Sequence, residues 1–310
     1  MNDEIQKILV LGSGAIGCFY GARLAKAGLE VSFVVRSDFE AVAQGGIHIH
    51  SYEGDFHITP AQVVARPEDY QGQADLVLVA TKVLAEIDLP GLLAPLVHPK
   101  LKVLLVQNGI EIEAPLAAAY PGLPILSAIA FVGVGRTGPG QVHHQLKGNL
   151  EVGAYPGGFG PELDQVMACL LKTGLEVKRS EDICLSRWKK LIWNGAFNPV
   201  SVLTQANTEQ MLQNPRTEAL LRKIMFEVVA LARAKGYDLE DRLVEQNLSV
   251  TYKMPPYKTS MLLDFEAHRH LETEAILGNP LKIARSLQVP VPHLETLAAL
   301  LELLAQVKKP

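Results

Sequence analysis

A glycine-rich turn near the N-terminus limits the folds open to this chain more than any other feature. The segment LGSGAIGCFYG follows the short apolar run Ile8–Leu11 and opens a stretch with helical periodicity, Ala15–Ala27. The β-branched run Val31–Val35 comes next and completes a strand–helix–strand unit. A strand that turns through Gly-x-Gly-x-x-Gly into a helix is typical of a parallel, doubly wound sheet.

Each glycine of this turn has a physical reason to be there if the turn binds a dinucleotide. Gly12 permits the tight turn, Gly14 lets the backbone approach a pyrophosphate, and Gly17 lets helix and strand pack closely. The helix N-terminus adds unpaired N–H groups and the positive end of the helix dipole. The alternative is a turn whose glycines serve packing only. We predict that the dinucleotide is bound by Gly12, Ser13, Gly14, Ala15, Ile16 and Gly17.

The end of the second strand indicates NADP rather than NAD. An NAD site places an acidic residue about 20 positions beyond the glycines, at the end of that strand. Here the strand ends in Val-Val-Arg-Ser, and the first acid is Asp38. The guanidinium of Arg36 suits a 2′-phosphate, and Lys82 is a second candidate for the adenine-side phosphate. The alternatives are a solvated surface arginine and a lysine at the start of a helix.

The rest of the chain divides into a mixed part and a helical part. Strands expected at Leu76–Ala80, Val103–Val106 and Ile125–Val134 extend the sheet, and alternating residues on both sides of Tyr52–Gly54 predict a hairpin. Further segments are expected as a helix at Leu84–Leu93, a last strand at Leu175–Lys178, and helices at Ile183–Ala206, Pro215–Lys235, Leu239–Thr251, Thr259–Leu277, Pro280–Leu287 and His293–Val307.

We therefore expect an α/β fold with an N-terminal Rossmann-like doubly wound sheet and a C-terminal all-α domain. Residues 1–180 would form the NADP-binding domain and residues 181–310 the helical substrate and catalytic domain.

Composition excludes several classes of protein. The net charge of -4 argues against non-specific nucleic-acid binding. Apolar runs stop well short of the ~20 residues that a membrane span needs. The three cysteines are scattered and form no CxxC pair, and the N-terminal segment MNDEIQK is too polar for a signal peptide. These features predict a cytoplasmic protein in a reducing compartment. They leave the oligomeric state open, with a homodimer among the options.

A polar stripe crosses a mostly apolar helix in the segment WKKLIWNGAFNPV. Lys190, Asn194 and Asn198 are four residues apart, so they share one face of a helix. If a nicotinamide cofactor delivers hydride to a ketone, a lysine can stabilise the developing charge on oxygen and protonate it. The asparagines can bind substrate oxygens. Alternatively, the lysine extends to solvent and the asparagines cap helices or face water.

Two further segments carry polar groups that favour a site. Asn108, in VQNGIE, follows a predicted parallel strand, where ligands of such sheets bind. The segment YKTSMLLDFEAHRHLETE contains Ser260, Asp264 and Glu272. In their order along the chain, GxGAIG, TK, QNG, KLxxNxxxNP, SMLxD and RHxE resemble the ketopantoate reductase (2-dehydropantoate 2-reductase) family over nearly the whole length.

The resemblance implies an activity and a general architecture. Members of this family pack an NADPH-binding Rossmann domain against an all-helical domain and bind the substrate in the cleft between them. They reduce the 2-oxo acid 2-dehydropantoate to pantoate, a step in pantothenate and coenzyme A synthesis.

The resemblance also assigns roles to residues. By motif, Lys190 matches the proton donor and Glu272 the carboxylate that works with it. The matching substrate-binding positions are Asn194, Asn198 and Ser260, and Asn108 matches an asparagine near nicotinamide and substrate. A glutamate beside the lysine is expected to favour its charged form.

Other polar residues of these segments are expected to be structural. Asp264 would anchor its helix, and His268 and His270 would be structural or surface residues. The pair His143–His144 lacks further ligands at metal spacing, so we expect no metal.

Departures from the family pattern leave a second activity open. Leu263 stands where members often have Gln, Leu277 precedes Gly278 where Asn is common, and Trp193 is unusually bulky. They would fit a related NADP-dependent reductase of another 2-oxo or 3-hydroxy acid. A third alternative, an NADP-binding sensor without catalysis, is disfavoured by the lysine and glutamate.

Overall fold

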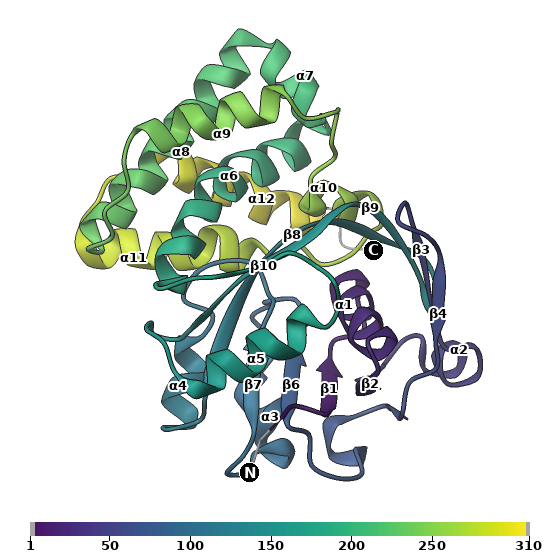
Figure 1. Ribbon diagram of the computed structural model, residues 1–310. Helices are drawn as coiled ribbons and strands as arrows, with labels where there is room; N and C mark the ends of the chain where they lie inside the picture. Colours follow the sequence, from purple (N-terminus) through teal and green to yellow (C-terminus); the bar gives the residue numbers. More distant parts are fainter. Residues whose placement is uncertain (1–3, 308–310) are drawn as a thin grey trace. The chain divides into compact units, whose positions relative to one another are not determined.

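The computed structural model describes residues 4–307 (Figure 1), so the first three residues of the polar N-terminal segment lie outside the described part. The chain forms two compact units. One, here called the α/β unit, comprises the chain up to residue 82, residues 88–107 and residues 112–184. The other, the helical unit, comprises residues 83–87, residues 108–111 and the chain from residue 185 onward.

The α/β unit is built on one sheet with strand order β4-β3-β9-β8-β7-β6-β1-β2-β5, and β10 pairs with β9. Within this order, the six neighbouring strands β8-β7-β6-β1-β2-β5 all pair in parallel, as in a doubly wound dinucleotide-binding fold. The predicted fold is therefore confirmed. The strands are β1 Lys7–Leu11, β2 Glu30–Val34, β3 Ile47–Ser51, β4 Phe56–Ile58, β5 Val63–Val64, β6 Leu76–Val79, β7 Lys102–Leu105, β8 Ile125–Gly138, β9 Gln141–Ala154 and β10 Val177–Arg179.

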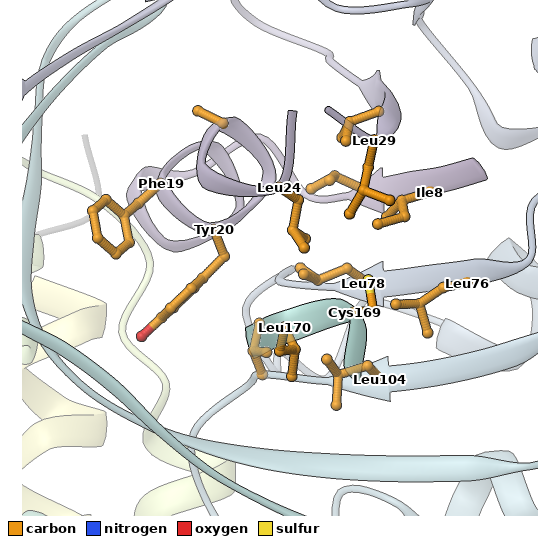
Figure 2. Packing of buried hydrophobic residues seen from close by; sticks show 14 of the residues in the cluster. Ile8, Phe19, Tyr20, Leu24, Leu29, Leu76, Leu78, Leu104, Cys169 and Leu170 are labelled. Carbon is orange, nitrogen blue, oxygen red and sulfur yellow. The ribbon is translucent and has the colours of Figure 1, made fainter. Parts of the chain in front are cut away.

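Helices complete this unit: α1 Ala15–Lys26, α2 Phe39–Gly45, α3 Leu89–Leu93, α4 Ala114–Ala119 and α5 Pro161–Leu171, with 3-10 turns at Pro67–Asp69 and Ala94–Leu96. On one face of the sheet, Ile8 and Leu78 pack with Leu24 of α1 and Leu170 of α5, as Figure 2 shows. The alternating residues of the same strands, such as Val77, are equally buried. Burial on both faces explains why these strands are continuous apolar runs.

Several predicted segments differ from the structure. The hairpin of β3 and β4 is confirmed, but β9, α5 and the short helix α7 were not predicted. The expected helix Leu84–Leu93 begins only at Leu89, where the Asp88 carboxylate accepts a hydrogen bond from the N–H of Gly91. The expected helix Thr259–Leu277 ends at Glu266, because the chain turns through a left-handed residue, His268, with φ of 52°.

The helix α6 contributes to the core of the helical unit. Its apolar side chains Trp188, Ile192 and Phe197 are buried with Met225 and Leu294 in one cluster. No helix in the described range is both long and apolar enough to cross a bilayer. The elements of this unit are α6 Ile183–Thr204, α7 Thr208–Gln213, α8 Pro215–Ala234, α9 Arg242–Tyr252, α10 Ser260–Glu266, a π-helical turn Glu274–Gly278, α11 Asn279–Leu287 and α12 Pro292–Val307.

The start of α12 generates a prediction about stability. The buried carboxylate of Glu227 in α8 accepts hydrogen bonds from the backbone N–H groups of His293 and Leu294, each at 2.9 Å. Charge-assisted bonds of this kind stabilise by roughly 1.5–3 kcal/mol each, so we expect Glu227→Ala, which removes both, to lower the free energy of unfolding by about 3 kcal/mol or more. Urea denaturation measures it. Glu302→Ala, at an exposed position of α12, is the control, and equal loss in both variants would contradict the prediction.

Candidate active site

The glycine-rich turn lies at the carboxyl end of β1, beside β6, where the strand order of the sheet reverses. A Cβ at Gly12 (φ +106°) would lie 2.5 Å from the backbone nitrogen of Thr81, and one at Gly17 would lie 1.9 Å from the carbonyl oxygen of Gly12. These two positions therefore permit close packing only without a side chain. A Cβ at Gly14 would meet nothing within 4 Å.

The space beside Gly14 has the properties of an anion-binding site. Gly14 caps α1 without any side-chain hydrogen bond, and the first turn of α1 carries no acidic residue. Backbone N–H groups and the helix dipole are thus available to a phosphate. Ser13, Ala15 and Ile16 line the same turn and are partly buried. The residues present therefore fit the pyrophosphate of a dinucleotide.

Arg36 is exposed directly beyond β2, and within the described residues its guanidinium has no hydrogen bond or ion pair. The neighbouring acid is engaged elsewhere. Asp38 is buried, pairs with Arg136, and accepts a hydrogen bond from the backbone N–H of Gly140 at 3.2 Å. This arrangement leaves a cation rather than a carboxylate at the position that selects between NADP and NAD.

Lys82 follows β6 and is partly buried. The segment before it is fixed within the α/β unit, because the side-chain amide of Gln107 donates to the carbonyl oxygen of Thr81 at 2.8 Å and to its hydroxyl at 3.0 Å. A phosphate contact of Lys82 stays a prediction.

The polar stripe lies in α6, as predicted. Asn194 and Asn198 are 7% and 3% exposed, which places two amides in a mostly apolar environment. In the described part of the chain, the side-chain oxygen of Asn198 is buried without a hydrogen-bond partner. A buried acceptor without a donor costs free energy. That cost is offset if a ligand supplies the donor.

Lys190 and Glu272 are joined through Asn108. The amine of Lys190 donates to the side-chain oxygen of Asn108 at 3.1 Å, and the amide nitrogen of Asn108 donates to one carboxylate oxygen of Glu272 at 3.4 Å. The other carboxylate oxygen accepts from the backbone N–H of Val83 at 3.2 Å. All four residues belong to the helical unit. We call this arrangement the Lys190–Asn108–Glu272 chain.

The electrostatics of Lys190 differ from the expectation. Burial of the amine and the positive charge of Arg187 lower the pKa of Lys190 to about 8, and Glu272 opposes this shift without reversing it. Glu272 thus favours the charged form of Lys190, as expected, but the net shift is downward because desolvation is the larger influence. A lysine with this pKa is mostly protonated at neutral pH yet releases its proton readily.

Ser260 is exposed at the first position of α10. The preceding residue, Thr259, caps this helix by accepting from the N–H of Leu262, and its hydroxyl lies 2.6 Å from that of Ser201 in α6. Ser201 in turn donates to the carbonyl oxygen of Asn198 at 2.8 Å. Buried hydroxyls therefore tie the start of α10 to the turn of α6 that carries Asn198.

The remaining candidates take structural positions. The carboxylate of Asp264 accepts from Arg269 at 2.7 Å, His268 is exposed, and exposed His270 lies 3.6 Å from Glu86. Among residues 4–307, no group of three or more His, Cys, Asp or Glu side chains is arranged to hold a metal ion.

Two of the three departures from the family pattern lie in packed positions. Trp193 stacks on Phe197 and donates to the hydroxyl of Thr251 at 3.0 Å. Leu277 is buried in the core of the helical unit. Leu263 is the fourth residue of α10 and is partly buried.

Two contributors to the site were not predicted. The backbone N–H of Val83 has no sequence signature. Arg187 precedes Lys190 by three residues in α6, so helical spacing alone could have drawn attention to it.

Comparison with known proteins identifies the family. Residues 8–157 match the family model described as ketopantoate reductase PanE/ApbA, and residues 182–305 match the model of its C-terminal part. The chain belongs to the ketopantoate reductase family. The resemblance seen in the sequence is thereby confirmed, as is the expectation of an oxidoreductase.

Individual members of the family are similar over nearly their full length. A 2-dehydropantoate 2-reductase of Nostoc sp. is 36% identical, with 96% of this chain and 94% of the relative covered. The crystal structure of 2-dehydropantoate 2-reductase from Methylococcus capsulatus is 45% identical, with a TM-score of 0.90 and 98% of both chains covered. A D-mandelate dehydrogenase solved with NADH and anilino(oxo)acetate shares the fold at 21% identity, with a TM-score of 0.88 and 96% and 97% coverage.

Two glycines of the turn, Gly14 and Gly17, give a prediction that separates packing from ligand binding. Gly17→Ala should lower the free energy of unfolding by about 2–3 kcal/mol, because its Cβ has no room. Gly14→Ala should cost less than about 1 kcal/mol. It should nevertheless weaken dinucleotide binding at least about tenfold, because the methyl group occupies the space of the phosphate. Urea denaturation and NADPH fluorescence titration measure the two effects. Undiminished NADPH affinity in Gly14→Ala would contradict the phosphate assignment.

Proposed function

We propose that this reductase converts 2-dehydropantoate to pantoate with NADPH, in the synthesis of pantothenate and coenzyme A. The observation that carries the proposal is the Lys190–Asn108–Glu272 chain, in which a lysine of lowered pKa donates to an amide that in turn donates to a carboxylate. Family membership supports the substrate and the cofactor. The open Gly14 position and the exposed cation of Arg36 support NADPH on the α/β unit.

The cofactor would be held by the backbone of Gly12–Gly17, with its 2′-phosphate on Arg36 and Lys82 as a further phosphate contact. When bound, the nicotinamide supplies hydride to the carbonyl carbon of a 2-oxo acid. Asn108 would lie near nicotinamide and substrate. Residues 1–180 and 181–310 are proposed as the cofactor domain and the substrate domain.

Lys190 supplies the other half of the reduction. Its ammonium group stabilises the negative charge that develops on the carbonyl oxygen and transfers a proton to that oxygen, so that an alcohol results and the amine becomes neutral. The amine then regains a proton from solvent. Asn108 and Glu272 orient the amine. Asn194, Asn198 and Ser260 would bind the carboxylate and hydroxyl oxygens of the substrate without adding charge.

A second candidate function is the reduction of another 2-oxo or 3-hydroxy acid with the same cofactor. The departures at Leu263, Leu277 and Trp193 favour it. The packing of Trp193 against Phe197 and Thr251 weakens this argument, because the bulky ring is accounted for by contacts within the core. A panel of 2-oxo acids separates the two candidates by the ratio of kcat/KM values.

Removal of the proton donor tests the mechanism. We expect Lys190→Ala to lower kcat for NADPH-dependent reduction of 2-dehydropantoate at least about 100-fold, the usual contribution of a general acid. NADPH oxidation followed at 340 nm measures it. Lys189→Ala, at the exposed neighbouring position in α6, should retain activity. Near-normal turnover in Lys190→Ala would refute the assignment of the donor.

The 2′-phosphate contact gives a second test. Arg36→Ala should raise KM for NADPH by roughly 10–100-fold, the equivalent of one lost charge-assisted contact, and leave KM for NADH nearly unchanged, since NADH lacks the phosphate. Steady-state kinetics with both cofactors provide the internal control. An equal change for both cofactors would mean that Arg36 does not contact the phosphate.

We also propose a homodimer in the cytoplasm. Leu300, Leu303 and Val307 form an exposed apolar stripe on α12, which supports a protein–protein contact. Light scattering after size exclusion should give twice the chain mass of 33.8 kDa; a single chain mass would reject the dimer. No disulfide joins the three cysteines, all of which lie in the described part of the chain.

A further inference from the structure

One buried arginine has no part in the mechanism above. Arg187 lies in α6, one helical turn before Lys190, and is 5% exposed. Arginine is rarely buried to this extent without specific partners, because removing a charge from water costs free energy. Its guanidinium donates a hydrogen bond to the backbone carbonyl oxygen of Gly109 at 3.0 Å. Gly109 directly follows Asn108, the middle member of the Lys190–Asn108–Glu272 chain.

The loop that contains Gly109 is held at several points of the helical unit. Gly109 has a φ of +101°, and a Cβ there would lie 2.4 Å from the Cβ of Ala275. The side-chain amide of Asn279 donates to the carbonyl oxygen of Ile110 at 2.8 Å. The loop therefore has little conformational freedom at Gly109 and Ile110. Arg187 holds the carbonyl of the residue that directly follows Asn108, so it is well placed to fix the backbone that orients the Asn108 side chain.

We propose that Arg187 is a positioning residue for proton transfer from Lys190. It holds Asn108 in place through the Gly109 carbonyl, and it acts on Lys190 through its own positive charge. The proposal rests on the proposed role of Lys190 as proton donor. It names a residue of this chain that the motifs KLxxNxxxNP and RHxE do not contain.

Charge is the second link between the two residues. Two charged groups that act on the Lys190 amine are Arg187, from the same helix, and Glu272, from the segment before the π-helical turn. Arg187 lowers the pKa of Lys190 and Glu272 raises it. Reduction requires protonated Lys190, so activity should be present below the pKa and be lost as pH rises through about 8. Without the charge of Arg187, this loss should occur at higher pH.

The experiment is the pH dependence of kcat/KM for 2-dehydropantoate reduction in wild type, Arg187→Met and Arg187→Lys. In Arg187→Met we expect the alkaline limb to move up by about one pH unit, the usual effect of one nearby charge, and kcat at pH 7 to fall roughly tenfold from misplacement of Asn108. Arg187→Lys keeps the positive charge but loses the planar guanidinium. The alkaline limb of its pH profile should therefore stay near that of wild type, while its kcat falls. Lys189→Met, at an exposed position, should change neither.

A direct titration separates this proposal from the proposed function. NMR spectra of lysine labelled with carbon-13 at Cε, with the Lys190 signal assigned by its loss in Lys190→Arg, report the pKa without any substrate. If the wild type did not reduce 2-dehydropantoate, the proposed function would fail, and a higher pKa of Lys190 in Arg187→Met would still support the charge effect.

The results that would overturn the proposal are equally specific. If Arg187→Met folds and leaves both the titration of Lys190 and the alkaline limb unchanged, Arg187 is only structural. If Arg187→Met does not fold, Arg187→Lys decides: unchanged kcat there refutes the positioning by the guanidinium.

Discussion

The amide of Asn108 accepts a hydrogen bond from Lys190 and donates one to Glu272, and both ends of the candidate site depend on it. An amide can do this because it presents a donor and an acceptor on neighbouring atoms. A carboxylate at this position would repel Glu272, and an amine would repel Lys190. The bridge separates the two charged groups by a neutral one, so neither neutralises the other fully. This leaves burial as the main influence on Lys190 and gives a lysine that can donate a proton near neutral pH.

The bridge also requires rigid surroundings. Asn108 follows β7, and its loop is fixed by Arg187, Ala275 and Asn279, which come from three separate elements of the helical unit. Catalytic groups need such support, because small displacements of a proton donor cost much of its effect. The unpartnered oxygen of Asn198 has the opposite character. Burying this acceptor without a donor makes the folded chain less stable. A ligand hydroxyl that donated to it would remove this cost, so the unpaired oxygen would favour ligand binding.

Much of this arrangement could be predicted from local patterns. Gly12, Gly14 and Gly17 predicted the β1–α1 turn because their spacing follows from backbone sterics alone. The four-residue spacing of Lys190, Asn194 and Asn198 predicted one face of α6 because helical periodicity is local. By contrast, β9 was not predicted, because its many polar residues hide the pattern of a strand. It pairs with the preceding strand β8 and with β3, which is distant in the sequence. The early end of α10 at Glu266 was also missed, because the left-handed turn at His268 has no strong local signal.

The sequence by itself determined the doubly wound sheet, the glycine turn after β1, the cation Arg36 after β2, and the polar face of α6. Each depends on residues close together in the chain. Only the tertiary structure decided which polar groups meet. It brought Asn108 to Lys190 and Glu272 across separations of 82 and 164 residues, and it engaged Asp38 with Arg136. It also decided the pKa of Lys190, because desolvation depends on every neighbour of the amine, and periodicity along one helix does not specify those neighbours.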